Sequence, residues 1–134
     1  MPARYRDRLQ ETCDGRMVIT VDPDRCLLVY PMPEWEKIEQ QLNKLPSFNR
    51  RARALQRLLL GHATESEFDS QGRMLLPAML RDYAGLQKKA VLIGQGNKFE
   101  VWDEETWNNK QSEWLDEMNG DDGELPDSLE NLSL

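Results

Sequence analysis

The sequence contains few of the residues that build catalytic and metal sites. Its 134 residues include one histidine, His62, and two cysteines, Cys13 and Cys26. A single histidine excludes a zinc site with several histidine ligands from one chain, and a structural disulfide is uncommon in a cytosolic protein. No Gly-x-Ser-x-Gly nucleophile motif accompanies the histidine. We therefore expect no enzyme, with no catalytic residue, no metal ligand and no cofactor.

Long apolar runs are missing as well. No stretch approaches the roughly 20 apolar residues that span a bilayer, and the start of the chain does not resemble a secretion signal. Hydrophobic residues make up 39% and charged residues 31%, which is ordinary for a globular protein. We expect a cytoplasmic protein without a membrane partner, folded as one compact domain or as two small units that share a core.

Positive charge is scarce overall, with 17 basic against 24 acidic residues and a net charge of −7. The excess of acid lies at the end of the chain, because residues 108–134 hold one basic and eight acidic residues. Residues 1–107 are neutral, and residues 1–62 carry a net charge of +3. The acidity therefore belongs to a tail that we expect to be mostly disordered beyond Met118, and it does not exclude nucleic acid as a partner of the rest.

The most informative feature is an internal repeat, in which four segments match in the same order. The matches are residues 2–7 with 77–82, 18–21 with 90–93, 27–30 with 99–102, and Trp35 with Trp107. The offset is 75 residues for the first match and 72 for the others. Three residues are therefore lost from the second copy, and we place this loss in the loop after the Pro-Ala segment.

Each copy has the same predicted order of elements. A short helical turn follows Pro-Ala, then come an apolar β-run, a polar turn, a second β-run and the start of a helix. The predicted β-runs are residues 17–21 and 26–30 in the first copy, and 90–93 and 98–102 in the second. Neither copy has enough apolar surface to fold alone, so we expect the two copies to pack together.

Two helices are predicted between the copies. Residues 33–45 place Trp35, Ile38, Leu42 and Leu45 on one stripe, and Pro46 ends this helix. Asn49 is a suitable N-cap for a second helix that reaches Leu60 and stops at Gly61, where His62 caps its end. The two helices form an αα-hairpin, and the equivalent positions of Trp35 and Trp107 favour core packing for both.

A turn motif, Asp69-x-x-Gly72-Arg73, precedes the second Pro-Ala segment. Asp at the first position and Gly at the fourth favour a tight turn between two strands, with Arg73 at the start of the second strand. The motif is common by chance when alone. Its place inside a repeat, before an apolar run that leads into Pro-Ala, makes it more specific.

With this motif the chain resembles the MraZ family, in the AbrB/SpoVT-like group of swapped-hairpin barrel proteins. The segments that carry the resemblance are residues 30–35, 57–63, 69–77 and 97–103. It implies an α+β fold with two tandem AbrB-like swapped-hairpin β units that form a small double-psi-like barrel, bridged by the αα-hairpin. The implied division is 1–35 for the first unit, 36–63 for the helical connector, 64–107 for the second unit and 108–134 for the acidic tail.

The first copy departs from the family at its front. Met1 aligns with Leu76, so no residue corresponds to positions 64–75, where the family carries another D-x-x-G-R turn. We expect a truncated first unit that lacks a strand, with an unpaired sheet edge and one turn arginine fewer.

The resemblance implies that the turn reads DNA. We expect Arg73, Gln71, Ser70 and Gly72 to contact DNA and Asp69 to support the turn, with phosphate contacts from Arg4, Arg6, Arg50 and Arg53. For Arg73 the alternative is a surface salt bridge to Asp69, which contributes little, although both can hold at once. For the other arginines the alternative is a solvated helix face.

The function implied is a DNA-binding transcriptional regulator that represses its own operon, the division and cell-wall cluster. It would bind short promoter repeats in double-stranded DNA as a ring-like homo-oligomer, in the cytoplasm at the nucleoid. Two alternatives remain: an antitoxin-like module of the same fold group, favoured only by the acidic tail, and an architectural oligomer without DNA affinity.

Overall fold

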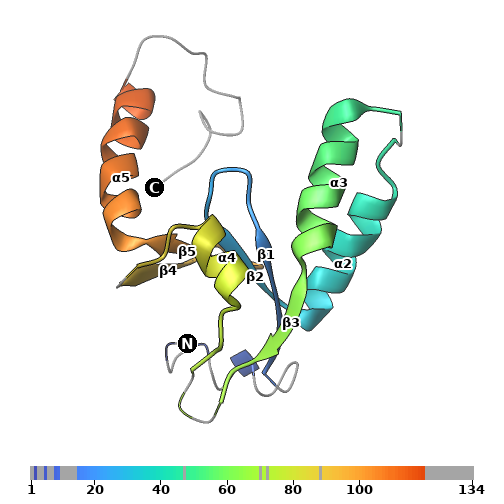
Figure 1. The fold of residues 1–134 in the computed structure, drawn as a ribbon, viewed down its shortest axis with the longest axis horizontal. Coiled ribbons are helices and arrows are strands. Elements are labelled where there is room, and N and C mark those ends of the chain that lie inside the picture. The colour runs from blue at the N-terminus through green and yellow to red at the C-terminus, as the bar shows by residue number, and fades with distance from the viewer. Residues whose placement is uncertain are drawn as a thin grey trace. The chain divides into compact units, whose positions relative to one another are not determined.

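The computed structural model describes residues 2, 5, 8, 9, 15–46, 48–69, 71, 73–87 and 89–119. The chain divides into two compact units, Met1–Glu104 and Glu105–Leu134. The described part is a mixed α+β structure with four helices and a five-stranded antiparallel sheet (Figure 1). It confirms the predicted α+β class. No helix among the described residues is long and apolar enough to cross a membrane.

The sheet has the strand order β3-β1-β2-β5-β4, and every neighbouring pair is antiparallel. The strands are β1 (Arg16–Val21), β2 (Leu27–Pro31), β3 (Thr64–Glu67), β4 (Ala90–Gly94) and β5 (Phe99–Asp103). The two repeat hairpins, β1–β2 and β4–β5, therefore form one continuous sheet. They are joined through β2 and β5.

The register of the β2–β5 pair shows an internal pseudo-twofold axis. Leu28 lies opposite Glu100, and Leu27 lies opposite Val101. Leu28 and Glu100 are equivalent positions of the repeat, so the axis passes between them. The two copies thus pack together around a pseudo-dyad through their second strands.

The register also corrects the repeat alignment. Ile19 pairs with Val29 in the first hairpin, and Leu92 pairs with Val101 in the second. Because Val101 is the counterpart of Val29, Leu92 corresponds to Ile19, at an offset of 73 residues. The expected offset of 72 was wrong here, since a slip of one residue turns every side chain to the other face of a sheet. Two residues are lost before β4, and the third is lost from the hairpin turn.

Two apolar clusters cover the two faces of the sheet. Met17, Ile19 and Leu27 belong to one cluster, which Leu80 and Phe99 complete. The other contains Val18, Leu28, Tyr30, Trp35 and Leu59. Because residues 17–21 of β1 and residues 27–30 of β2 are buried on both faces, they are apolar except for Thr20 and do not alternate between apolar and polar residues.

Two helices pack side by side on the second cluster (Figure 1). Helix α2 (Met32–Asn43) buries Trp35 and Leu42, as the predicted stripe requires, but it ends at Asn43, two residues before the predicted end at Leu45. Helix α3 (Arg50–His62) begins where Asn49 Oδ1 accepts a hydrogen bond from the Ala52 amide at 3.1 Å, which confirms the predicted N-cap. Its predicted stop at Gly61 was wrong. The helix continues to His62, whose Nδ1 lies 2.8 Å from the Leu58 carbonyl oxygen.

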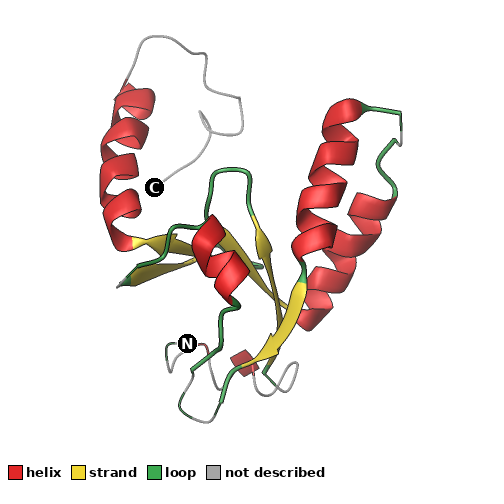
Figure 2. Cartoon of the chain, in the orientation of Figure 1, coloured by secondary structure: helices red, strands yellow, loops and turns green. Residues whose placement is uncertain are grey.

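The remaining helices are α4 (Ala78–Tyr83), which follows Pro77, and α5 (Glu104–Asn119). Leu80 of α4 is fully buried in the first cluster. Figure 2 shows α4 joined to β3 by a long loop that contains the predicted turn motif. Helix α5 buries none of its residues, and its Trp107 is half-buried with its ring 5.2 Å from that of Trp114. The expected core packing therefore holds for Trp35, whereas Trp107 lies outside both clusters.

Candidate nucleic-acid interface

The turn after β3 is organised by the carboxylate of Asp69. Its Oδ1 accepts hydrogen bonds from the backbone amides of Gln71 and Arg73, each at 2.9 Å. Its Oδ2 accepts one from Arg73 Nε, also at 2.9 Å. The backbone amide of Asp69 in turn donates to the Arg73 carbonyl at 2.8 Å and closes the turn.

These bonds favour the ionised form of the carboxyl group. The backbone hydrogen bond from Arg73 lowers the pKa of Asp69 below its ordinary value, and the side chain of Arg73 and the Gln71 amide act in the same direction. The Asp69–Arg73 salt bridge expected as the alternative reading is therefore present. It lies at the surface, with 73% of the Arg73 side chain exposed, so it orients the guanidinium without covering it.

The segment after the turn is less regular than predicted. Arg73 was expected to begin a second strand, but beyond it the described residues form only an isolated bridge between Phe68 and Met74. Residues 75–77 have no strand pairing. Leu75 is 83% exposed and, with Asp69 and Arg73, lines an open depression of about 470 Å³.

The other predicted contact residues are only partly described. Gln71 is exposed beside Arg73. Ser70, Gly72, Arg4 and Arg6 lie outside the described residues. Arg50 and Arg53 lie in the first turn of α3, where Arg50 is exposed and Arg53 is half-buried.

The N-terminal end of α3 has an unusual charge for a helix. Its first turn contains no acidic residue, although the partial positive charge of a helix N-terminus favours acidic side chains there. Arg50, Arg51 and Arg57 are all exposed on this helix. Such a surface attracts anions such as phosphates or carboxylates.

The sequence did not reveal a contact that ties the first hairpin turn to α4. The Tyr83 hydroxyl donates to the Asp22 carbonyl at 2.7 Å, and the Arg25 guanidinium lies 4.7 Å from the centre of the Tyr83 ring. Arg25 has a positive φ of 68°, a strained conformation for a residue other than glycine. No local signal identifies this contact, because Tyr83 and Asp22 are 61 residues apart.

The described residues contain no group of three or more histidine, cysteine, aspartate or glutamate side chains arranged to hold a metal ion. Cys26 is a free, fully buried thiol, and burial together with the nearby Asp22 raises its pKa. Exposed arginine and glutamine at a fixed turn are suited to binding, not to covalent chemistry.

The chain is similar to known proteins over most of its length. The profile of the family described as "MraZ protein, putative antitoxin-like" matches the chain twice, at residues 1–58 and 59–124. "Transcriptional regulator MraZ" of Thioalkalivibrio sulfidiphilus is 63% identical over 134 residues, which cover 100% of this chain and 89% of that protein. The proteins of the same name from Halorhodospira halophila and Nitrosospira multiformis are 54% and 51% identical, cover 99% and 100% of this chain, and are each covered to 88%. The chain therefore belongs to the MraZ family.

Proposed function

We propose that this chain is a DNA-binding transcriptional regulator that uses the Asp69–Arg73 turn to contact DNA. The observation that carries the proposal is the Arg73 guanidinium, which is oriented by Asp69 through Nε and still 73% exposed. The relatives' shared name, "Transcriptional regulator MraZ", supports the regulatory role.

Arg73 is chemically suited to this task. A guanidinium has five N–H donors, and the hydrogen bond to Asp69 uses the one on Nε. The donors on the other two nitrogens can form two hydrogen bonds at once, either to a phosphate or to the O6 and N7 atoms of guanine. Gln71 lies next to it, with Ser70 and Gly72 adjacent in sequence as further contacts. Arg50 of α3, and Arg4, Arg6 and Arg53, would neutralise phosphates.

The finer architecture is part of the proposal. We assign residues 1–35 and 64–107 to two AbrB-like units, 36–63 to the connector and 108–134 to an acidic tail. The pseudo-dyad between Leu28 and Glu100 supports two related units, and a double-psi-like barrel with exchanged hairpins is the form that this symmetry favours.

Several weak contacts must act together, because residues 1–107 carry no net charge. We propose that the chain binds short promoter repeats as a ring-like homo-oligomer, where many weak contacts add up to high avidity. It would repress its own operon, the division and cell-wall cluster, by occupying the promoter in the cytoplasm at the nucleoid.

Helices α3 and α5 are suited to the contact between copies. Four arginines and no acidic residue lie on α3, whereas α5 has five acidic residues and one lysine. Leu115 and Met118 of α5 are 62% and 64% exposed, and along α3 the exposed positions include the small residues Ala54 and Gly61. We place the α5 helix of one copy along α3 of the next copy. This contact would cover the exposed apolar residues and bring an acidic helix next to a basic one. Because it joins two different surfaces head to tail, repeated contacts of this kind can close into a ring.

The test is a DNA-binding measurement with duplex DNA from upstream of the chain's own gene. We expect Arg73→Ala to weaken specific binding by about ten- to a hundredfold. Arg73→Lys keeps the charge but loses the planar guanidinium that forms two parallel hydrogen bonds. Compared with Arg73→Ala, it should therefore recover only the affinity that comes from charge attraction to phosphates. Wild-type binding should fall steeply as salt is raised.

The matched control is Arg81→Ala, which removes the same charge from an exposed position on α4. It should change the affinity less than Arg73→Ala does. If wild type bound no better than Arg73→Ala, Arg73 would not be the DNA-reading residue. If wild type assembled but bound no DNA at any salt concentration, the architectural alternative would replace this proposal.

An antitoxin-like module is the second candidate. The family description and the exposed apolar residues on acidic α5 favour it. In that case a basic toxic protein would bind α5, and Met118→Lys would abolish the protection of growing cells against that protein. Equal protection by wild type and Met118→Lys would argue against it.

A further inference from the structure

Helix α5 has an apolar groove on one side, with a volume of about 400 Å³. The residues that line it are Trp107, Gln111, Trp114, Leu115 and Met118. The two tryptophan rings meet edge to face, with their centres 5.2 Å apart. Leu115 and Met118 are 62% and 64% exposed. Within the described part of the chain, this apolar surface is therefore largely open.

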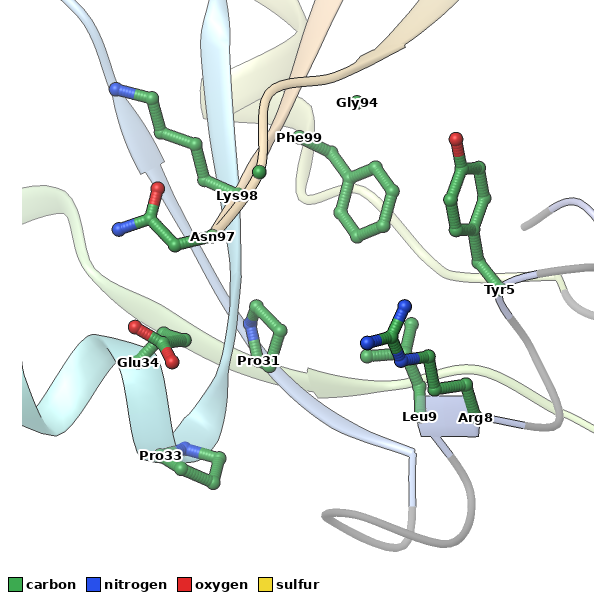
Figure 3. Close-up of a pocket in the computed structure, with 11 residues that line it drawn as sticks. Tyr5, Arg8, Leu9, Pro31, Pro33, Glu34, Gly94, Asn97, Lys98 and Phe99 are labelled. Carbon is green, nitrogen blue, oxygen red and sulfur yellow. The ribbon is translucent and has the colours of Figure 1, made fainter.

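A second hollow, between the N-terminal segment and the β4–β5 turn, is covered by the chain itself (Figure 3). There the Tyr5 ring lies edge-on to the Phe99 ring, with the ring centres 5.1 Å apart. The Tyr5 hydroxyl lies so close to Gly94 that an added Cβ would be only 3.1 Å away from it. This hollow already contains an aromatic contact of its own, so it gives no reason to expect a further partner.

The repeat shows how a surface like the α5 groove is covered in the first copy. At the 72-residue offset, Trp107 is the counterpart of Trp35 and Trp114 is the counterpart of Leu42. Trp35 and Leu42 are buried in the cluster that α2 shares with α3. Helices α2 and α3 run antiparallel and side by side (Figure 1). The counterparts on α5 therefore form a surface of the kind that an antiparallel helix covers.

The centre of the groove is a straight row of residues along the helix. Its members are separated by four, three and four positions: Trp107, Gln111, Trp114 and Met118. Exposed residues of α3 have the same spacing: Arg50, Ala54, Arg57 and Gly61. We call these sets the α5 row and the α3 row. Rows with this spacing pack lengthwise against each other in helix pairs.

The sizes of the side chains favour an antiparallel pair of rows. In that direction Trp107 lies opposite Gly61, and Trp114 lies opposite Ala54. A Cβ added at Gly61 would have no atom of its own chain within 4 Å, so an indole ring has room there. In the parallel direction both rings would lie opposite arginines. Each large residue therefore meets a small one only when the helices run in opposite directions.

The distribution of charge favours the same direction. Three of the five acidic residues of α5 lie in its C-terminal half: Glu113, Asp116 and Glu117. Three of the four arginines of α3 lie in its N-terminal half: Arg50, Arg51 and Arg53. Antiparallel packing brings these two halves together, and parallel packing separates them. Size and charge thus select the same arrangement, although they depend on different residues.

We infer that α5 of one copy packs antiparallel against α3 of the next copy, with Trp107 on Gly61 and Trp114 on Ala54. Arg57 then lies between the two tryptophan rings, where a guanidinium is attracted to the ring faces. The inference rests on the proposed contact between α5 and α3. It gives that contact a direction, a register and its central residues.

Disulfide cross-linking of the full chain tests the direction. Met118 lies opposite Arg50 in the antiparallel pair and opposite Gly61 in the parallel pair. On oxidation, Arg50→Cys, Met118→Cys should form covalent multimers about tenfold faster than Met118→Cys alone, which measures the background from the native cysteines. The matched control is Gly61→Cys, Met118→Cys, which should not exceed this background.

An exchange of large and small residues tests the register. Gly61→Leu places a large side chain where the Trp107 ring should fit, so it should weaken self-association by about tenfold or more in light scattering. It should not lower the melting temperature, because leucine is the better helix former and has space at this position. Adding Trp107→Ala to Gly61→Leu should restore assembly. Adding Leu115→Ala instead should not.

Two results would overturn the inference while the contact between α5 and α3 stood. One is faster cross-linking of Gly61→Cys, Met118→Cys than of Arg50→Cys, Met118→Cys. The other is equal rescue of Gly61→Leu by Trp107→Ala and by Leu115→Ala. A monomeric wild type would overturn the contact itself and the inference with it. None of these results bears on the proposed DNA contact of Arg73, which is measured separately.

Discussion

The carboxylate of Asp69 determines the geometry of the turn that presents Arg73. Three donors converge on it, and two of them are backbone amides, which only a substitution by proline would remove. Each of these bonds is stronger when the acceptor is ionised. The turn should therefore hold its shape only while Asp69 carries its charge.

A pH titration tests this dependence. The pKa of Asp69 is lowered in the folded chain, so its ionised form adds stability that is present above the ordinary value of 3.8 and is lost as the pH falls through the folded value. The amide shifts of Gln71 and Arg73 should therefore titrate together with a midpoint below 3.8. Asp69→Asn should remove this transition. A midpoint at or above 3.8 would contradict the hydrogen-bond pattern.

Thr20 is a fully buried polar residue among the apolar residues of β1. Its hydroxyl donates to the Leu59 carbonyl at 2.6 Å. That carbonyl belongs to the last turn of α3, where backbone oxygens have no partner within the helix. The contact thus joins β1 to the end of α3.

Replacement of Thr20 by valine keeps the shape of the side chain and removes the donor. We expect Thr20→Val to lower the free energy of unfolding by about 1–3 kcal/mol, because the Leu59 carbonyl would stay buried without its partner. Urea unfolding followed by circular dichroism measures this change. Thr64→Val, at a half-buried position with a 3.2 Å bond to the His62 carbonyl, is the control and should cost less. Equal losses for the two variants would argue against a special role of Thr20.

At the scale of elements, the sequence predicts what depends on near neighbours. The stripe through Trp35 and Leu42 and the N-cap at Asn49 place α2 and α3 correctly, because helix period and capping are local. The contact between Asp69 and Arg73 is also local, because the two residues are four positions apart in the sequence. The end of α3 was misjudged because Gly61 can be accommodated within a helix when the following residue caps the last turn.

The offset of β4 and the contact of Tyr83 could not be derived in the same way. The apolar runs of residues 17–21 and 90–93 do not alternate strictly between apolar and polar residues, so nothing in the sequence marks which face Ile19 or Leu92 occupies. Tyr83 meets Asp22 only because the two copies pack around their pseudo-dyad. The turn motif could be found from the sequence, but its surroundings depend on this long-range packing.

The bond from Tyr83 to the first hairpin turn links α4 to β1 and β2. Tyr83→Phe keeps the ring beneath Arg25 and removes only the hydroxyl that donates to Asp22 at 2.7 Å. We expect the free energy of unfolding to fall by about 1 kcal/mol. The urea midpoint should decrease while the slope of the transition stays unchanged. A midpoint equal to that of wild type would show that water replaces the hydroxyl without cost.

At the scale of the whole molecule, charge is divided between helices. Basic residues gather on α3 and acidic residues on α5. A chain that met DNA through a single copy would gain little from this division, because α5 repels phosphate. A chain that assembles with copies of itself gains from it, since each acidic helix can shield arginines of a neighbour that do not face DNA.

Assembly through α5 is tested with the double variant Leu115→Lys, Met118→Lys. Two lysines on the exposed apolar side should prevent burial of that side and repel the arginines of α3, so the mass measured by light scattering should fall to that of a monomer. The control is Asn109→Lys, Asp116→Asn, which changes the charge equally on the opposite side of the helix and should lower the mass less than the Leu115→Lys, Met118→Lys variant does. Arg57→Glu should also lower the mass, because it places an acid opposite acidic α5. If both the α5 and the α3 variants kept the wild-type mass, copies of this chain would associate through another surface.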